Sequence, residues 1–154
     1  MYIPEMIFGE LLTGSNFDDG QKKVTGGRNG YGAKLTNIYS KSFCVESADS
    51  TWKKIISIQW RDNMGIKESP KIKDYNKGSD FVEIRFIPDY KRFKLDNITD
   101  DLYWLFKKWV FDLAGVLAKK VRLSFNKEEI KIDSFESYAK LYFDQDSTAF
   151  MLPF

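Results

Sequence analysis

The sequence predicts an α+β domain, a two-layer sandwich of a mostly antiparallel sheet with helices on one face. Several short segments alternate apolar and polar residues with a period of two, which is typical of strands covered on one side only. Helical patterns stand before, between and after these segments, as expected for a two-layer α+β fold. The 154 residues are 43% apolar and 16% aromatic, enough for one buried core and too many for a disordered chain. We therefore expect residues 1–154 to form a single domain.

Two helices are expected in the first forty residues. The first covers residues 3–12 and is opened by Pro4, which is favourable in the first turn of a helix. The second runs from Ala33 to Ser40 and follows directly on a group of glycines. Both carry apolar residues at helical spacing, so one face of each should be buried. Those apolar residues are Met6, Ile7 and Leu11 in the first helix and Leu35, Ile38 and Tyr39 in the second.

Four strands are expected between residues 43 and 88. Three of them alternate strictly, and a weaker one lies over residues 71–75. Pro88 ends the last strand, because proline has no N–H to donate to a strand ladder. The alternating positions on the apolar face are Phe43, Val45 and Ser47, then Ile56, Ile58 and Trp60, then Val82, Ile84 and Phe86.

The longest expected helix covers residues 97–118. Asn97 or Thr99 can cap its N-terminus. Its apolar stripe is wide enough to pack against one face of the sheet. The stripe consists of Leu102, Leu105, Phe106, Trp109, Leu113 and Leu117. A hairpin over residues 121–132 follows, and a last helix is expected to start near Ser134.

The composition excludes several kinds of chemistry. The chain has no histidine, which rules out Ser-His-Asp and Cys-His nucleophilic sites, an imidazole general base and histidine-containing zinc sites. Its only cysteine, Cys44, can form neither an internal disulfide nor a CxxC site. The net charge of 24 − 22 = +2 is too small to indicate nucleic-acid or membrane binding by itself. Because we find no secretory signal and no apolar run of about 20 residues, we expect an intracellular domain without a membrane partner.

A glycine-rich segment between the first two expected helices is the most informative part of the chain. Residues 13–32 hold six of the ten glycines, and loops of this length inside a domain are usually functional or disordered. The run from Gly26 to Lys34 matches neither the P-loop nor the Rossmann fingerprint. Glycines can still turn several backbone N–H groups toward one point, and Arg28 and Lys34 add positive charge. The segment is therefore either an anion-binding loop, with Gly30 and its neighbours in conformations that side chains resist, or a flexible connection.

The residues of this segment also carry a family resemblance. The run from Ile7 to Ser40, IFGELLTGSNFDDGQKKVTGGRNGYGAKLTNIYS, resembles the ATPase region of eukaryotic-type DNA topoisomerase II. The similarity continues through Phe81–Asp89, Asp112–Gly115 and Ser134–Tyr138. It implies the fold of the gyrase, Hsp90, histidine kinase and MutL ATPase superfamily, of which this chain would be the C-terminal part of the ATP-binding domain. Residues 135–154 would then be the start of the following transducer region.

The resemblance implies that residues 13–34 form a lid that closes over ATP. It places eight residues on the phosphates: Gly27, Arg28, Asn29, Gly30, Tyr31, Gly32, Ala33 and Lys34. Ser15 and Asn16 match a Ser-Asn pair beside the nucleoside, although Gly14 stands where the family usually has serine. From the residues alone, Ser15 and Asn16 could instead be turn residues and Tyr31 could pack. With Gly30 and Gly32 both resisting a side chain, an alanine at either position should weaken ATP binding.

The parts of the family pattern that this chain lacks are equally important. No glutamate is followed by asparagine four residues later, so the general base and the Mg²⁺ ligand of the superfamily are not found here. The adenine-binding Asp-x-Gly-x-Gly and the Gln-Thr-Lys loop are also missing, since Asp18-Asp19-Gly20 lacks the second glycine. We therefore assign no catalytic residue and no metal ligand, and we expect the chain alone to be inactive.

The resemblance also implies a complete enzyme. That enzyme would be a nuclear, ATP-hydrolysing type II DNA topoisomerase, an isomerase that passes one DNA duplex through another. It would be a homodimer that binds double-stranded DNA, ATP and Mg²⁺. Two alternatives stay open at this point. The chain could be a non-catalytic interaction module that keeps the fold, or another member of the same ATPase superfamily.

Overall fold

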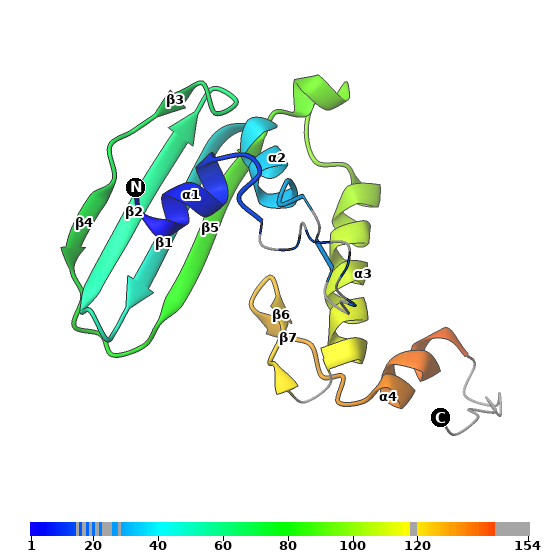
Figure 1. The fold of residues 1–154 in the computed structure, drawn as a ribbon. Helices are drawn as coiled ribbons and strands as arrows, with labels where there is room; N and C mark the ends of the chain where they lie inside the picture. The colour runs from blue at the N-terminus through cyan, green and yellow to red at the C-terminus, as the bar shows by residue number, and fades with distance from the viewer. Residues whose placement is uncertain are drawn as a thin grey trace. The chain divides into compact units, whose positions relative to one another are not determined.

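The computed structural model describes residues 1–14, 16, 18, 20, 22, 26–27, 29–117 and 120–143. The chain separates into two compact units, residues 1–96 and residues 97–154, and each is described by itself (Figure 1). The expectation of a single domain over residues 1–154 stays a prediction. None of the helices in the described ranges is long and apolar enough to cross a membrane.

The first unit is an antiparallel sheet with two short helices. The helices are α1 (Ile3–Gly9) and α2 (Gly32–Ile38), and the strands are β1 (Ser40–Asp49), β2 (Lys54–Arg61), β3 (Ile66–Lys67), β4 (Lys71–Asp74) and β5 (Phe81–Pro88), followed by the 3₁₀ helix η1 (Tyr90–Phe93). The sheet order is β3-β2-β1-β5, and β4 also pairs with β2. Every pairing is antiparallel, which confirms the predicted sheet. The short strand β3 was not expected, because two residues are too few to show a period.

The core of the first unit lies on one face of β1 and β2. Phe43 pairs with Trp60 and Val45 with Ile58 in the β1–β2 register. All four side chains are only 1% exposed, as the alternation predicts. Burying such a side chain contributes about 1.5–3 kcal/mol, so these four residues are the main stabilising contribution to the sheet. Phe8 of α1 packs against this cluster, and its ring centroid lies 5.9 Å from that of Phe43.

Strand β5 keeps the predicted alternation but not the predicted burial. In the register with β1, Phe86 lies opposite Phe43 and Ile84 opposite Val45, so these side chains share the face of the core. Ile84 and Phe86 are nevertheless 45% and 48% exposed, and Val82 is 63% exposed. The core cluster lies over β1 and β2, and within the described residues β5 lies beside it at an edge of the sheet.

The buried faces of α1 and α2 differ from the predicted ones. In α1, which ends at Gly9, Met6 and Ile7 are exposed, and so is Leu11 beyond it. In α2, Leu35 is exposed and Ile38 is half-buried, whereas Lys34 and Asn37 are buried. The Asn37 amide donates to the Phe8 carbonyl at 3.0 Å, which joins the two helices. Polar side chains with partners in the first unit therefore occupy positions that the apolar pattern assigned to the solvent.

The second unit consists of helices and one small hairpin. Its elements are α3 (Asp100–Leu117), β6 (Ser124–Phe125), β7 (Glu128–Glu129), α4 (Phe135–Ala139) and the 3₁₀ helix η3 (Lys140–Tyr142). Thr99 caps α3 by accepting a hydrogen bond from the Leu102 amide, as one of the two predicted caps. The hairpin is shorter than predicted and turns at Asn126 and Lys127, which both have positive φ. Packing of α3 against the sheet stays a prediction.

Candidate anion-binding site at the base of the glycine loop

The two ends of the glycine loop, residues 13–34, lie against each other. A Cβ atom added to Gly30 would lie 3.0 Å from the Gly14 backbone nitrogen and 3.4 Å from the Lys34 ammonium. Gly14, at the start of the loop, therefore lies against Gly30, 16 positions further along the chain. The loop has a closed base within the first unit, and Lys34 stands at that base.

Lys34 is a buried cation with one observed polar partner. Its side chain is 3% exposed, and its ammonium donates a hydrogen bond to the Thr13 hydroxyl at 2.7 Å. Among the described residues no carboxylate forms an ion pair with it. A buried charge that lacks an opposite charge is unfavourable, and a bound anion would offset that penalty.

The glycines of the loop are not equivalent. Gly27 and Gly30 have φ values of +84° and +64°, a conformation that L side chains rarely adopt. Gly32 opens α2, its φ is not in that region, and a Cβ added to it would meet nothing within 4 Å. The prediction that the backbone resists a side chain thus holds at Gly30 and is wrong at Gly32. Helical geometry at the first residue of α2 accepts any L residue, which is the physical reason.

The remaining predicted site residues fall into three groups. Ser15 and Arg28 lie outside the described residues. Asn16 donates through its amide to the Gly27 carbonyl at 3.1 Å, so it bridges the two arms of the loop. The others are more exposed than Lys34: Asn29 and Tyr31 are exposed and Ala33 is half-buried. The structure therefore brings Lys34 together with Gly30.

Thr13 completes this base and was not among the predicted site residues. Its hydroxyl lies 3.3 Å from the carbonyl oxygens of both Met6 and Glu10, at the C-terminal end of α1. It also accepts the hydrogen bond from Lys34. A sequence signal exists only in part: a threonine directly after a helix can bond to helix carbonyls, but its pairing with a residue 21 positions later is not visible in any local pattern.

Helix α1, which carries this contact, is held to the sheet at its other end. Glu5 is 7% exposed and accepts hydrogen bonds from the Tyr2 amide at 3.1 Å and from the Lys67 ammonium on β3. The Lys67 ammonium, with the Tyr2 amide, lowers the pKa of Glu5, and Glu5 in turn raises the pKa of Lys67. The carboxylate therefore stays charged, and the ion pair fixes the helix that precedes the loop.

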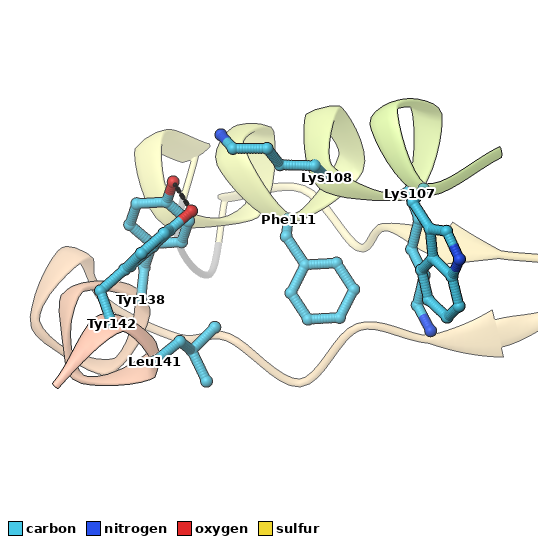
Figure 2. A pocket seen from close by; sticks show the side chains of 7 residues that line it. Lys107, Lys108, Phe111, Tyr138, Leu141 and Tyr142 are labelled. Atoms are coloured by element: carbon cyan, nitrogen blue, oxygen red, sulfur yellow. Dashed lines mark hydrogen bonds between the residues drawn. The ribbon is translucent and has the colours of Figure 1, made fainter. Parts of the chain in front are cut away.

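A second concave region lies in the second unit (Figure 2). A pocket of about 250 Å³ is lined by Trp104, Lys107, Lys108, Phe111, Tyr138, Leu141 and Tyr142. Its polar groups are engaged with one another. Lys108 lies 2.7 Å from an Asp112 carboxylate oxygen, and the Tyr138 and Tyr142 hydroxyls are 2.8 Å apart. Lys107 lies over the Trp104 ring, 5.0 Å from its centroid. Each of these polar groups therefore already has a partner within the second unit.

The glycine-loop base has the chemistry of a site that binds an anion, because its buried Lys34 ammonium is a cation and a hydrogen-bond donor. Those residues include no group of three or more Cys, Asp or Glu side chains that could hold a metal ion. The glycine-loop base presents one ammonium, a group that can only donate hydrogen bonds. An anion with several acceptor oxygens, such as a phosphate chain, fits such a set of donors.

The chain is similar to type II DNA topoisomerases from several organisms. No protein-family model matches the chain. It is 48% identical to DNA topoisomerase 2 of Arabidopsis thaliana over 142 residues, which is 92% of this chain. The crystal structure of the ATPase region of Saccharomyces cerevisiae topoisomerase II matches 92% of the chain with a TM-score of 0.86 and 44% identity. The ATPase and transducer domains of DNA topoisomerase II from Balamuthia mandrillaris match the same share with a TM-score of 0.80 and 42% identity. The predicted fold, part of a gyrase-type ATPase domain, is thereby confirmed.

The matched region is a small part of these relatives. The chain spans 10% of the length of the Arabidopsis thaliana protein and 37% of each of the two solved chains. The rest of each relative lies outside the matched region.

Proposed function

Since this chain is homologous to part of the ATPase region of eukaryotic DNA topoisomerase II, we propose that residues 13–34 form the phosphate-binding lid of an ATP site. One observation carries the proposal: the Lys34 ammonium is buried, and its one observed partner is the neutral Thr13 hydroxyl. A protein that keeps a charge in this state has either a compensating anion or a destabilising defect. The adjoining Gly30 supports the first reading, because its lack of a side chain lets the loop backbone come close to the ammonium.

The proposed binding uses backbone donors and one charge. The glycines with positive φ and the first residues of α2 would direct N–H groups at the phosphate oxygens. Lys34 would supply the cation. The full proposed set is Gly27, Arg28, Asn29, Gly30, Tyr31, Gly32, Ala33 and Lys34 on the phosphates, with Ser15 and Asn16 beside the nucleoside. Asn16 would keep its bond to Gly27 or exchange it for the ligand when the lid closes.

The wider role of the protein is proposed on the same basis. It would be part of an ATP-hydrolysing type II DNA topoisomerase, an isomerase that passes one duplex through another. That enzyme would be a nuclear homodimer, and its Mg²⁺ ligand would lie outside this chain. ATP supplies the free energy of clamp closure and reset, whereas the residues described here only bind and orient its phosphates. Residues 135–154 would begin the transducer region.

The direct test separates a functional cation from a structural one. Lys34→Met keeps a side chain of similar length and removes its charge. The free energy of unfolding should therefore stay equal or rise. The segment 13–34 of this chain, with and without this substitution, would replace the matching segment in the Saccharomyces cerevisiae ATPase region. Titration with a non-hydrolysable ATP analogue should show binding weakened about tenfold or more, since one hydrogen bond to a charged group is lost. Normal binding by the Lys34→Met chimera would contradict the proposal.

The glycines give a second and larger effect in the same chimera. Gly30→Ala should weaken binding of the analogue at least about a hundredfold, because the N–H groups are misdirected and two or three charge-assisted hydrogen bonds are lost. Gly32→Ala is the matched control for backbone strain, since its conformation accepts a side chain. Any loss at Gly32 must then come from crowding of the bound phosphate. If both variants stay folded and bind the analogue normally, the loop only connects α1 to α2. The alternative of a non-catalytic interaction module would then be better supported.

A further inference from the structure

We propose that Thr13 is a positioning residue for the Lys34 ammonium. The proposal rests on the proposed phosphate role of Lys34 and extends it: Thr13 touches no ligand, and it determines where the cation points. Nothing in the predicted set of phosphate contacts includes Thr13. Its place follows from three oxygen and nitrogen atoms that surround its hydroxyl.

The direction of each hydrogen bond at Thr13 can be assigned from the chemistry of the groups. The Lys34 ammonium, 2.7 Å away, has three protons and no lone pair, so the Thr13 oxygen must accept. The Met6 and Glu10 carbonyl oxygens, each 3.3 Å away, can only accept, so the single hydroxyl proton must go to one of them. The bonds therefore run in one direction, from Lys34 through Thr13 to α1.

These hydrogen bonds connect the Lys34 ammonium to a fixed part of the fold. Its last acceptor lies at the C-terminal end of α1. That helix is held by the Glu5–Lys67 ion pair and by packing of Phe8 on the core. The Lys34 side chain, four methylenes long, would otherwise have several rotamers available. Thr13 selects the one that keeps the ammonium beside Gly30.

Removing the hydroxyl should release the ammonium. In Thr13→Val the volume and the branching at Cβ are kept, but the side chain can neither accept from Lys34 nor donate to α1. A buried ammonium that has lost its partner is unfavourable, so Lys34 should turn toward water. Thr13→Ser restores the hydroxyl and should restore the buried position. Thr51→Val, in the turn between β1 and β2, is a matched control for the loss of a hydroxyl elsewhere.

The measurement is the rate at which Lys34 is acetylated in this chain, read by peptide mass spectrometry without any nucleotide. We expect Thr13→Val to raise that rate about tenfold, as the loss of one hydrogen bond to a charged group implies, while other lysines react as before. Thr13→Ser and Thr51→Val should leave it within about twofold, since both keep that bond. An unchanged Lys34 rate in a folded Thr13→Val protein would overturn the proposal, as would equal acceleration by Thr13→Ser.

Two precautions keep the outcome decisive. If Thr13→Val unfolds the chain, all lysines accelerate together, and the comparison is repeated with Thr13→Ala against Thr13→Ser, which differ by one oxygen atom. The assay contains no phosphate, so it can succeed when the Lys34→Met chimera binds the ATP analogue normally. That combination would support Thr13 as the residue that positions Lys34 and would contradict the proposed function. If the chimera binds the analogue weakly but Thr13→Val leaves the Lys34 acetylation rate unchanged, only the role of Thr13 is contradicted.

Discussion

The two compact units of this chain are stabilised in different ways. In the first unit a sheet buries Phe43, Val45, Ile58 and Trp60 to 1% exposure. In the second unit the residues described as buried are Ala114 and Gly115, and large apolar side chains such as Trp109 are about half exposed. Polar contacts join its helices: Asp112 of α3 accepts from Lys108 and from the Tyr138 hydroxyl of α4 at 2.6 Å. A strictly alternating sheet can build a core within 96 residues, whereas one long helix needs apolar surface supplied from elsewhere.

The largest expected effect contrasts a tryptophan from each unit. Trp60→Ala should lower the free energy of unfolding by about 3–5 kcal/mol, because it empties the core of the sheet. Trp109→Ala should lower it by clearly less, since about half of that side chain is already exposed to water. Urea denaturation followed by circular dichroism measures both. Equal losses would mean that the second unit has a core of its own, contrary to the comparison.

The next effect concerns the contact between α3 and α4. A Cβ atom added to Gly115 would lie 2.6 Å from Cγ of the Tyr138 ring, closer than real contacts allow. Gly115→Ala should therefore push α4 away and destabilise the second unit by about 1–3 kcal/mol, the usual cost of overpacking. Hydrogen exchange of the α4 amides measures it. Protection in β1 and β2 should not change, and a loss of protection there would indicate that the units unfold together.

A smaller effect is expected at the glycine loop of the first unit. Gly30→Ala should cost about 1–2 kcal/mol, because an L side chain is strained at positive φ. Gly32→Ala should be neutral or stabilising by about 0.4–1 kcal/mol, since it restricts the unfolded chain at a position that accepts a side chain. Thermal unfolding of both variants beside the parent chain gives the comparison. Two equal losses would show that the loop geometry described here is wrong.

The smallest effect is a pH dependence of the second unit. Lys108, together with the Tyr138 hydroxyl, lowers the pKa of Asp112, and Asp112 raises the pKa of Tyr138. A carboxylate with a lowered pKa stabilises the fold above its ordinary pKa, and this contribution is lost as the pH falls through the lowered value. Asp112→Asn should therefore reduce stability at neutral pH and flatten the acid limb of the stability curve. An unchanged acid limb would show that Asp112 does not contribute to the pH dependence of stability.

The sequence predicted well wherever a short pattern decides the structure. Strict alternation located β1, β2 and β5, and the helical stripe with Thr99 located α3. Positive φ at Gly30 agrees with the expected loop conformation. The errors have a common origin: Met6 and Leu35 were expected to be buried and are exposed, while Lys34 and Asn37 are buried. Apolar residues at helical spacing identify a face that can be buried. They do not show whether a polar side chain of the same helix will be buried instead because it finds a hydrogen-bond partner.

The local sequence by itself determined the longer elements, the alternation of the strands and the glycine-rich loop, because each depends on residues within a few positions of one another. The tertiary structure alone decided three things. It joined Lys34 to Thr13 across 21 positions. It placed the core over β1 and β2, so the apolar face of the edge strand β5 stays largely exposed. It also showed that Gly30 has a positive φ and close neighbours, whereas Gly32 has neither. Burial and partnership depend on residues distant in the chain, and no local period records them.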